Sequence, residues 1–199
     1  MKALRPIFII LALLSFGSFV HAQVKPDAGA DLPLQWGRPD AEFQIEVFVD
    51  LQCPSCANFN RVLKSLEKKY PERIFVTFRH FPLQIPAHDK AFLAATVVEA
   101  AYRQLKGIEM MDMVLSNQKA WSTKENAREI FLGYAKKLGL KIPQFEQDLE
   151  SDLTSMRIKQ DRARAESLDL HSTPSVFLNG KFLDFAAALN IEELITKAE

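Results

Sequence analysis

Residues 48–56 read FVDLQCPSC, and this stretch holds both cysteines of the 199-residue chain. The segment that leads into it, Phe43–Val49, is apolar and β-branched with a period near two, which predicts a strand. Beyond Cys53, apolar residues recur at helical spacing until the Tyr-Pro pair at residues 70–71 stops the pattern. The cysteine pair is therefore expected where a strand ends and a helix begins.

Three more strands are predicted further along the chain. Residues 74–81 alternate in the same way as the first strand and predict a second long one. Near the C-terminus, residues 175–178 and 181–183 flank the dipeptide Asn179-Gly180, which is the strongest short signal for a β-hairpin. With a last helix at the C-terminus, the two ends of the chain run β-α-β and β-β-α.

The middle of the chain, residues 82–171, is predicted to be helical. Apolar residues recur at helical spacing over residues 127–138, and Ser122 with Glu125 fits a capping box in front of them. The charged stretch 159–166 is expected to be a solvated helix face. This order of elements matches an α/β fold with a thioredoxin-like core and an inserted helical subdomain.

The N-terminus reads as a secretory signal peptide over residues 1–22, with a basic start, an apolar run and a small-residue cleavage site ending at Ala22. An uncleaved membrane anchor is the alternative, but the apolar run falls short of the ~20 residues that a span needs. The protein is therefore expected in the periplasm or another extracytoplasmic compartment. We expect the remaining segments to be a loop-like N-terminal lead-in over 23–41, the core over 42–81 and 172–199, and the insertion over 82–171.

The charges are balanced, with 25 Lys and Arg against 25 Asp and Glu. A nucleic-acid-binding surface is usually strongly basic. We therefore expect no nucleic-acid partner.

The two cysteines indicate chemistry rather than a structural staple. Exported proteins with structural disulfides usually carry several pairs, and a bridge between Cys53 and Cys56 would close too short a loop to stabilise the fold much. A zinc site is the other alternative, but zinc needs two further ligands, and His80, His88 and His171 lack a paired spacing. We expect no metal and no cofactor, only a redox-active disulfide.

The position of each cysteine predicts its role. Cys53 would lie at a helix N-terminus, where unpaired amides and the helix dipole favour thiolate, so it is predicted to be the nucleophile. Cys56 follows one turn later and is predicted to be the resolving thiol that releases a mixed disulfide. Between them, Pro54 suits the first helical turn because it lacks an N–H, and Ser55 offers a hydroxyl to the thiolate.

Four motifs recur in one order along the chain: WGRPDA at 36–41, the cysteine motif, RHFPL at 79–83 followed by His88, and TPSVFLNG at 173–180. Together they resemble the DsbA-like thiol-disulfide oxidoreductases, some of which also carry Cys-Pro-Ser-Cys. The resemblance covers nearly all of the chain after residue 22. It implies an enzyme with a thioredoxin fold.

The resemblance also implies that Pro174 is a cis-proline opposite the active site. Such a loop would bring the backbone of Thr173 beside Cys53, where it can pair with an extended substrate. An ordinary trans turn before a strand is the alternative.

One position departs from the family pattern. Related proteins often place a buried acid six residues before the nucleophilic cysteine, and Val47 stands there in this chain. Asp50 is a candidate proton relay in its place, and a turn-capping role for it is equally open. Glu46 lies nearby, but neighbouring strand positions face opposite sides of a sheet.

The resemblance implies a dithiol oxidase that passes its disulfide to reduced or unfolded exported proteins. We expect a membrane redox partner to recycle it, and we expect it to act as a monomer. A disulfide reductase or isomerase is the enzymatic alternative, although residues 23–41 are too short for the dimerisation domain that isomerases usually carry. A redox-inert peptide-binding or chaperone module is the alternative from another class.

Overall fold

A computed structural model describes residues 26–197 of the chain. The signal peptide predicted for residues 1–22 lies outside the described residues. Within them, no helix is both long enough and apolar enough to span a membrane.

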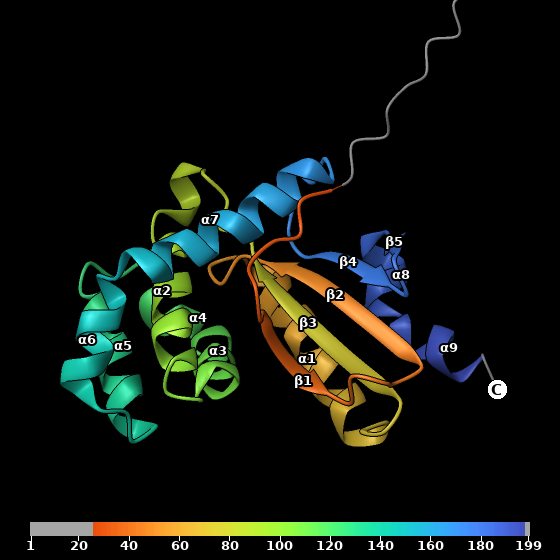
Figure 1. The fold of residues 1–199 in the computed structure, drawn as a ribbon, viewed down its shortest axis with the longest axis horizontal. Helices are drawn as coiled ribbons and strands as arrows, with labels where there is room; N and C mark the ends of the chain where they lie inside the picture. The colour runs from red at the N-terminus through yellow and green to blue at the C-terminus, as the bar shows by residue number, and fades with distance from the viewer. Residues whose placement is uncertain (1–25, 198–199) are drawn as a thin grey trace, which may run out of the picture.

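A five-stranded mixed sheet forms the centre of the molecule, in the order β1-β3-β2-β4-β5 (Figure 1). β2 pairs parallel with β3 and antiparallel with β4, so it is covered on both edges. Buried apolar residues dominate β2 and β3, as expected for strands packed on both faces. The strands are β1 (Leu34–Gly37), β2 (Phe43–Val49), β3 (Ile74–His80), β4 (Ser175–Leu178) and β5 (Lys181–Leu183).

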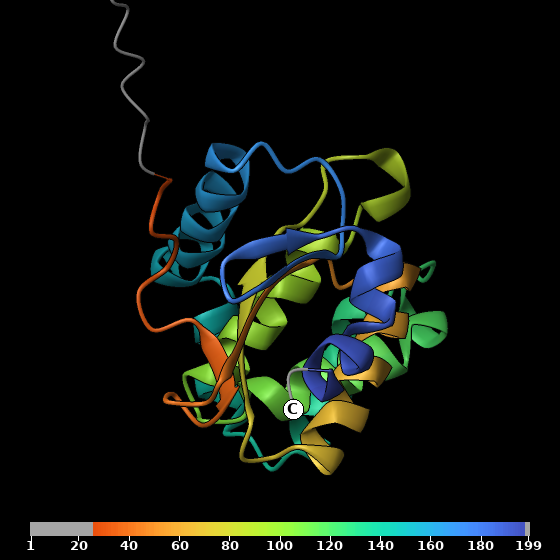
Figure 2. The same cartoon turned by 90° about the vertical axis from the view of Figure 1, so that its right-hand side faces the viewer.

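Helices cover both faces of the sheet. Figure 2 shows α1, α8 and α9 on one side and α7 on the other. The helical insertion lies between β3 and β4, so the predicted order of strands and helices is confirmed. The helices are α1 (Pro54–Lys69), a 3-10 turn at Pro86–His88, α2 (Ala91–Tyr102), α3 (Gly107–Ser116), α4 (Gln118–Trp121), α5 (Ala127–Lys137), α6 (Ile142–Leu149), α7 (Asp152–Ser167), α8 (Phe185–Leu189) and α9 (Ile191–Thr196).

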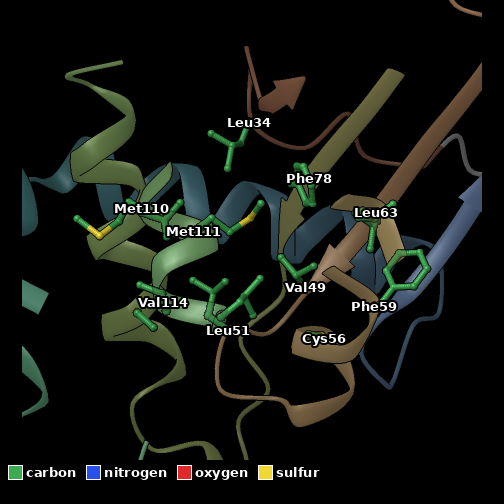
Figure 3. Close-up of a cluster of buried hydrophobic side chains, with 14 of the residues drawn as sticks. Leu34, Val49, Leu51, Cys56, Phe59, Leu63, Phe78, Met110, Met111 and Val114 are labelled. Atoms are coloured by element: carbon green, nitrogen blue, oxygen red, sulfur yellow. The ribbon is translucent and has the colours of Figure 1, made fainter. Parts of the chain in front are cut away.

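The main hydrophobic core joins the sheet to α1 and to the insertion. Figure 3 shows part of it, with Phe59 and Leu63 from α1 and with Met110 and Met111 from α3. Both methionines are fully buried, and Cys56 belongs to the same cluster. The active-site helix is therefore held by the same contacts that hold the insertion in place.

The lead-in is not a loop throughout, because residues 34–37 form the edge strand β1, antiparallel to β3. Pro33 and Pro39 lie just outside this strand, where neither proline removes a hydrogen bond of the sheet. Edge strands tolerate proline at such positions. Gly37 ends it with φ +93°, and a Cβ atom there would overlap the carbonyl oxygen of Ile74. A glycine is therefore needed where the chain leaves the sheet.

Two expectations about the insertion are wrong. α5 is capped by Asn126 rather than by Ser122, and no side chain bonds its first amides, so the capping box does not form. The charged stretch 159–166 is not simply a solvated face, because Asp161 is buried and Arg164 half-buried. α7 packs against β3, and this contact turns one side of a charged helix into an interface.

Candidate active site

The cysteine motif occupies the turn that leads from β2 into α1. Cys53 is the N-cap of α1 with an extended backbone, and its amide donates to the carbonyl of Asp50 at 3.1 Å. Pro54 takes the first helical position, as predicted, where a missing N–H leaves no helical bond unmade. The amide of Cys56 then donates to the carbonyl of Cys53 at 3.1 Å. Local sequence thus places both thiols in the first turn of one helix.

Cys53 carries the more acidic thiol. Its pKa is lowered to about 5, mainly because the Cys56 thiol donates a hydrogen bond to the thiolate. Thr173 and the backbone amides of Cys56 and Ser55 add to this effect, while partial burial opposes it. At this pKa the sulfur is a thiolate at neutral pH. Ser55 contributes through its backbone amide, and a contribution from its hydroxyl stays a prediction.

Cys56 has the opposite character. Its side chain is 1% exposed, against 8% for Cys53, and both thiols are free. Burial raises the pKa of the Cys56 thiol well above its ordinary value, and the hydrogen bond to Cys53 raises it further. One thiolate and one thiol therefore coexist in contact at neutral pH. This geometry agrees with the predicted nucleophilic and resolving roles, which stay predictions.

The loop before β4 lies against the cysteines. The peptide bond between Thr173 and Pro174 is cis, and Pro174 is buried. The carbonyl oxygen of Thr173 lies 3.3 Å from Sγ of Cys53 and can accept from the protonated thiol. Oγ1 of Thr173 is buried without a hydrogen-bond partner in the described chain, and Thr173 is among the groups that lower the pKa of Cys53. The two ends of the core thus meet at Cys53.

Asp50 caps the active-site turn, and its role as a proton relay stays a prediction. Its carboxylate is fully buried, and Oδ1 accepts from the amide of Gln52 at 2.7 Å, which caps the turn. Oδ2 accepts from the amide of Leu83 at 2.9 Å and lies 2.7 Å from Nδ1 of His88. His88 belongs to a motif of the sequence, but no role had been assigned to it.

The neighbouring strand positions offer no acid at the active site. Val47 is fully buried and is the register partner of Phe78 in β3. Glu46 pairs with Arg79 at 3.0 Å and with Arg164 of α7 at 2.8 Å, as alternation along the strand requires. The carboxylate of Glu46 is thus committed to the α7 side of the sheet.

Two glutamines that the sequence did not single out anchor the active-site turn. Nε2 of Gln118, in α4, donates to the carbonyls of Leu51 and Cys53 at 2.8 and 2.9 Å. Nε2 of Gln52 donates to the carbonyl of Ser122 at 2.8 Å, and its Oε1 accepts from the amide of Lys90 at 2.8 Å. The helical insertion therefore holds the turn in place. No local pattern marks such residues, because their partners lie far away in the sequence.

Among residues 26–197, no cluster of three or more His, Cys, Asp or Glu side chains could hold a metal ion. The reactive groups of the site are the two thiols. A thiolate of low pKa can attack a disulfide or depart from one as the leaving group. A buried thiol in contact with it can then displace the bound partner and form the Cys53–Cys56 disulfide.

Comparison with known proteins places these features in a family. A family model described as thioredoxin matches residues 31–196. The chain is 28% identical over 194 residues to a "Probable disulfide bond formation protein D" of Bacillus anthracis, covering 90% of this chain and 88% of that protein. It is also 33% identical over 147 residues to "Na(+)/H(+) antiporter NhaA 1" of Mycolicibacterium gilvum, covering 73% of this chain. The chain spans only 23% of the length of that antiporter.

Solved structures share the fold. BdbD from Bacillus subtilis in its oxidised form superposes with a TM-score of 0.71 at 20% identity, covering 86% of this chain and 97% of that one. MdbA from Corynebacterium diphtheriae, a thiol-disulfide oxidoreductase, superposes with a TM-score of 0.62 at 21% identity, covering 78% and 84%. The predicted thioredoxin-like fold with a helical insertion is confirmed.

Proposed function

Because the chain belongs to the DsbA-like thiol-disulfide oxidoreductases of the thioredoxin family, we propose that it is an exported dithiol oxidase. The observation that carries this proposal is the opposite displacement of the two thiol pKa values. The lowered pKa of Cys53 suits it to be the leaving group. The raised pKa of Cys56 suits it to be the resolving thiol.

The lowered pKa also supports the direction of electron flow. A stabilised Cys53 thiolate favours the reduced enzyme over its disulfide, and this makes the disulfide a stronger oxidant. A thiol of low pKa is at the same time a better leaving group. Both effects favour the oxidation of substrate thiols over the reduction of substrate disulfides.

In the proposed cycle, a substrate thiolate attacks Sγ of Cys53, and the bond between Cys53 and Cys56 breaks. Cys56 takes the electron pair and then a proton. A second substrate thiolate attacks the substrate sulfur of the mixed disulfide, and Cys53 leaves as a thiolate. The substrate has then lost two electrons and gained a disulfide, and the enzyme holds them as a thiolate and a thiol.

The substrates we propose are reduced or unfolded exported proteins that bear thiols. The backbone of Thr173 lies beside Cys53 and offers an extended segment a place to add as a strand. A membrane redox partner would then take the electrons from Cys53, with the enzyme acting as a monomer. The signal peptide predicted at residues 1–22 supports an extracytoplasmic site of action, and disulfides form mainly in such oxidising compartments.

The reduction potential of the Cys53/Cys56 pair tests the proposal. The protein is equilibrated with glutathione buffers of graded ratio, and the fraction oxidised is followed by mass spectrometry after alkylation. We expect a potential above about −180 mV, on the oxidising side of the glutathione pool. A value near the −270 mV typical of thioredoxin would indicate a reductase instead. A chain that exchanges no disulfide would be a redox-inert binding module.

A further inference from the structure

A groove of about 550 Å³ runs along α1 beside the active-site turn, and we call it the α1 groove. One wall is α1 from Pro54 to Arg61. The other wall is residues 115–120, which end α3 and begin α4. Pro54 follows Cys53 directly in the chain, so one end of the groove lies next to the nucleophile. The proposed cycle leaves this groove without a role.

The two walls of the α1 groove are joined by hydrogen bonds. Nε2 of Gln118 reaches from α4 to the start of α1 and donates to the carbonyl of Cys53 at 2.9 Å. Nδ2 of Asn60 in α1 donates to Oδ1 of Asp112 in α3 at 3.0 Å. The walls are therefore fixed relative to each other before a substrate binds, which lowers the entropic cost of binding.

The α1 groove is positively charged. Arg61 and Lys119 are its charged residues, both are exposed, and no Asp or Glu lines it. Each of the other arginines of residues 26–197 pairs with an Asp or Glu, whereas Arg61 donates to the amide oxygen of Asn58. Lys119 forms no ion pair within the described residues either. The groove thus holds two positive charges that no carboxylate of this part of the chain compensates.

Neighbouring groups on α1 and α3 leave this charge in place. Asp112 and Glu67 both pair with Lys64, at 2.6 and 2.9 Å, so their carboxylates are already engaged. The dipole of α1 adds positive charge at Pro54, where the helix begins. A guanidinium binds carboxylates through charge-assisted hydrogen bonds. The ligand that fits this groove is therefore an acidic side chain.

The distance from Cys53 to Arg61 matches a short extended segment. Arg61 comes eight positions after Cys53, which is ~12 Å along a helix at ~1.5 Å per residue. An extended chain advances ~3.4 Å per residue, so three or four residues cover that distance. An acid three or four positions from the cysteine that attacks Cys53 can therefore reach the α1 groove.

We propose that the α1 groove binds acidic side chains that flank the reacting cysteine of a substrate, so that the enzyme prefers thiols in acidic segments. The inference deepens the proposed function and rests on it. Arg61 and Lys119 are specificity-determining residues in this view. They choose among substrates, while the thiols carry out the exchange.

The test compares three synthetic peptides of equal length with one cysteine each. Positions three and four on either side of the cysteine hold Glu, Gln or Lys. The oxidised protein is mixed with each peptide in excess at pH 7 and low salt. Acid quenching, alkylation and mass spectrometry then give the rate at which the Cys53–Cys56 disulfide is lost.

Each rate is divided by the rate of the double variant Arg61→Gln/Lys119→Gln with the same peptide, because this ratio cancels the reactivity of the peptide thiol itself. We expect the ratio to be about fivefold higher for the Glu peptide than for the Gln peptide, and lower again for the Lys peptide. Sodium chloride at about 0.5 M should reduce the difference, since it screens exposed charges.

A matched control removes the same charge elsewhere. Lys68 lies at the far end of α1, and Lys181 lies in β5 beside the start of β2; both are exposed and neither forms an ion pair in the described chain. Lys68→Gln/Lys181→Gln should give the same ratio for all three peptides. The charge-retaining variant Arg61→Lys/Lys119→Arg should keep the preference for the Glu peptide.

The outcomes separate this inference from the proposed function. Equal slowing of all three peptides by Arg61→Gln/Lys119→Gln would overturn the inference, because it would show an effect on the thiols rather than on substrate choice. An equal loss of preference in the Lys68→Gln/Lys181→Gln control would overturn it too. If circular dichroism shows that the first variant is misfolded, the salt dependence of the natural protein with the three peptides decides in its place. A natural protein that exchanges its disulfide with none of the peptides would contradict the proposed function itself.

Discussion

Sγ of Cys53 lies 3.3 Å from the carbonyl oxygen of Thr173, although 120 positions separate the two residues in the chain. The carbonyl can accept from the protonated thiol, and Thr173 is also among the groups that lower the pKa of Cys53. This contact ties the acidity of the nucleophile to the loop where we place the substrate.

Removing the hydroxyl should weaken the thiolate. In Thr173→Val we expect the pKa of Cys53 to rise by about one unit, since one hydrogen bond to a charged group is lost, which corresponds to ~1.4 kcal/mol. Ultraviolet absorbance of the thiolate against pH measures it. Thr173→Ser keeps the hydroxyl and should titrate like the natural protein. Equal pKa values in all three proteins would show that the hydroxyl is not a donor.

Alkylation of the reduced protein should be selective and should depend on pH in a defined direction. The pKa of Cys53 is lowered, so its thiolate forms as pH rises through about 5 and is lost below that value. Iodoacetamide should therefore label Cys53 with a rate that reaches its plateau above pH 6. Cys56 should stay unlabelled at neutral pH because burial holds it protonated. Peptide mapping by mass spectrometry gives both rates. A labelling midpoint near 8.5, the ordinary cysteine value, would contradict this assignment.

Mixed disulfides should accumulate on one variant and not on the other. Cys56→Ser lacks the resolving thiol, so we expect proteins from envelope extracts to remain linked to Cys53. Cys53→Ser should capture none, since Cys56 is buried and protonated. Two-dimensional electrophoresis, non-reducing in the first dimension and reducing in the second, separates the captured proteins from the variant. Equal capture by both variants would mean that the two roles are shared or reversed.

The buried ion pairs under α7 should carry much of the stability of the fold. Asp161 accepts from the amides of Ala30 and His80 and pairs with Arg79, with all three distances between 2.9 and 3.0 Å. Asp161→Ala leaves two buried amides without an acceptor and removes one of the two carboxylates that pair with Arg79, so we expect a loss of ~3–5 kcal/mol in the free energy of unfolding. Urea titration measures it.

The matched control for this loss lies on the same helix. Glu166 forms an exposed pair with Arg162 at 2.7 Å, and such pairs contribute ~0–1 kcal/mol. Glu166→Ala should therefore unfold at nearly the urea concentration of the natural protein. Similar losses in both variants would show that helix propensity, rather than the buried network, sets the stability here.

Local signals in the sequence determined the parts of this protein that depend on near neighbours. The alternation of Phe43–Val49, the helical spacing after Cys53 and the Asn179-Gly180 turn all appear where they were predicted. Asn179 and Gly180 both have positive φ, as the two-residue hairpin requires. These elements are set within a few residues of chain, so pattern and turn chemistry suffice.

Tertiary packing decided the rest. β1 is a strand only because β3, some forty residues later, offers it a free edge, and Asp161 is buried only because α7 crosses the sheet. The pairing of Asp50 with His88 and the contact of Thr173 with Cys53 likewise join distant segments. Burial and hydrogen bonding between such segments depend on how whole elements pack. The sequence marks Cys53, Thr173 and Asp50 as candidates, but their contacts exist only in the folded chain.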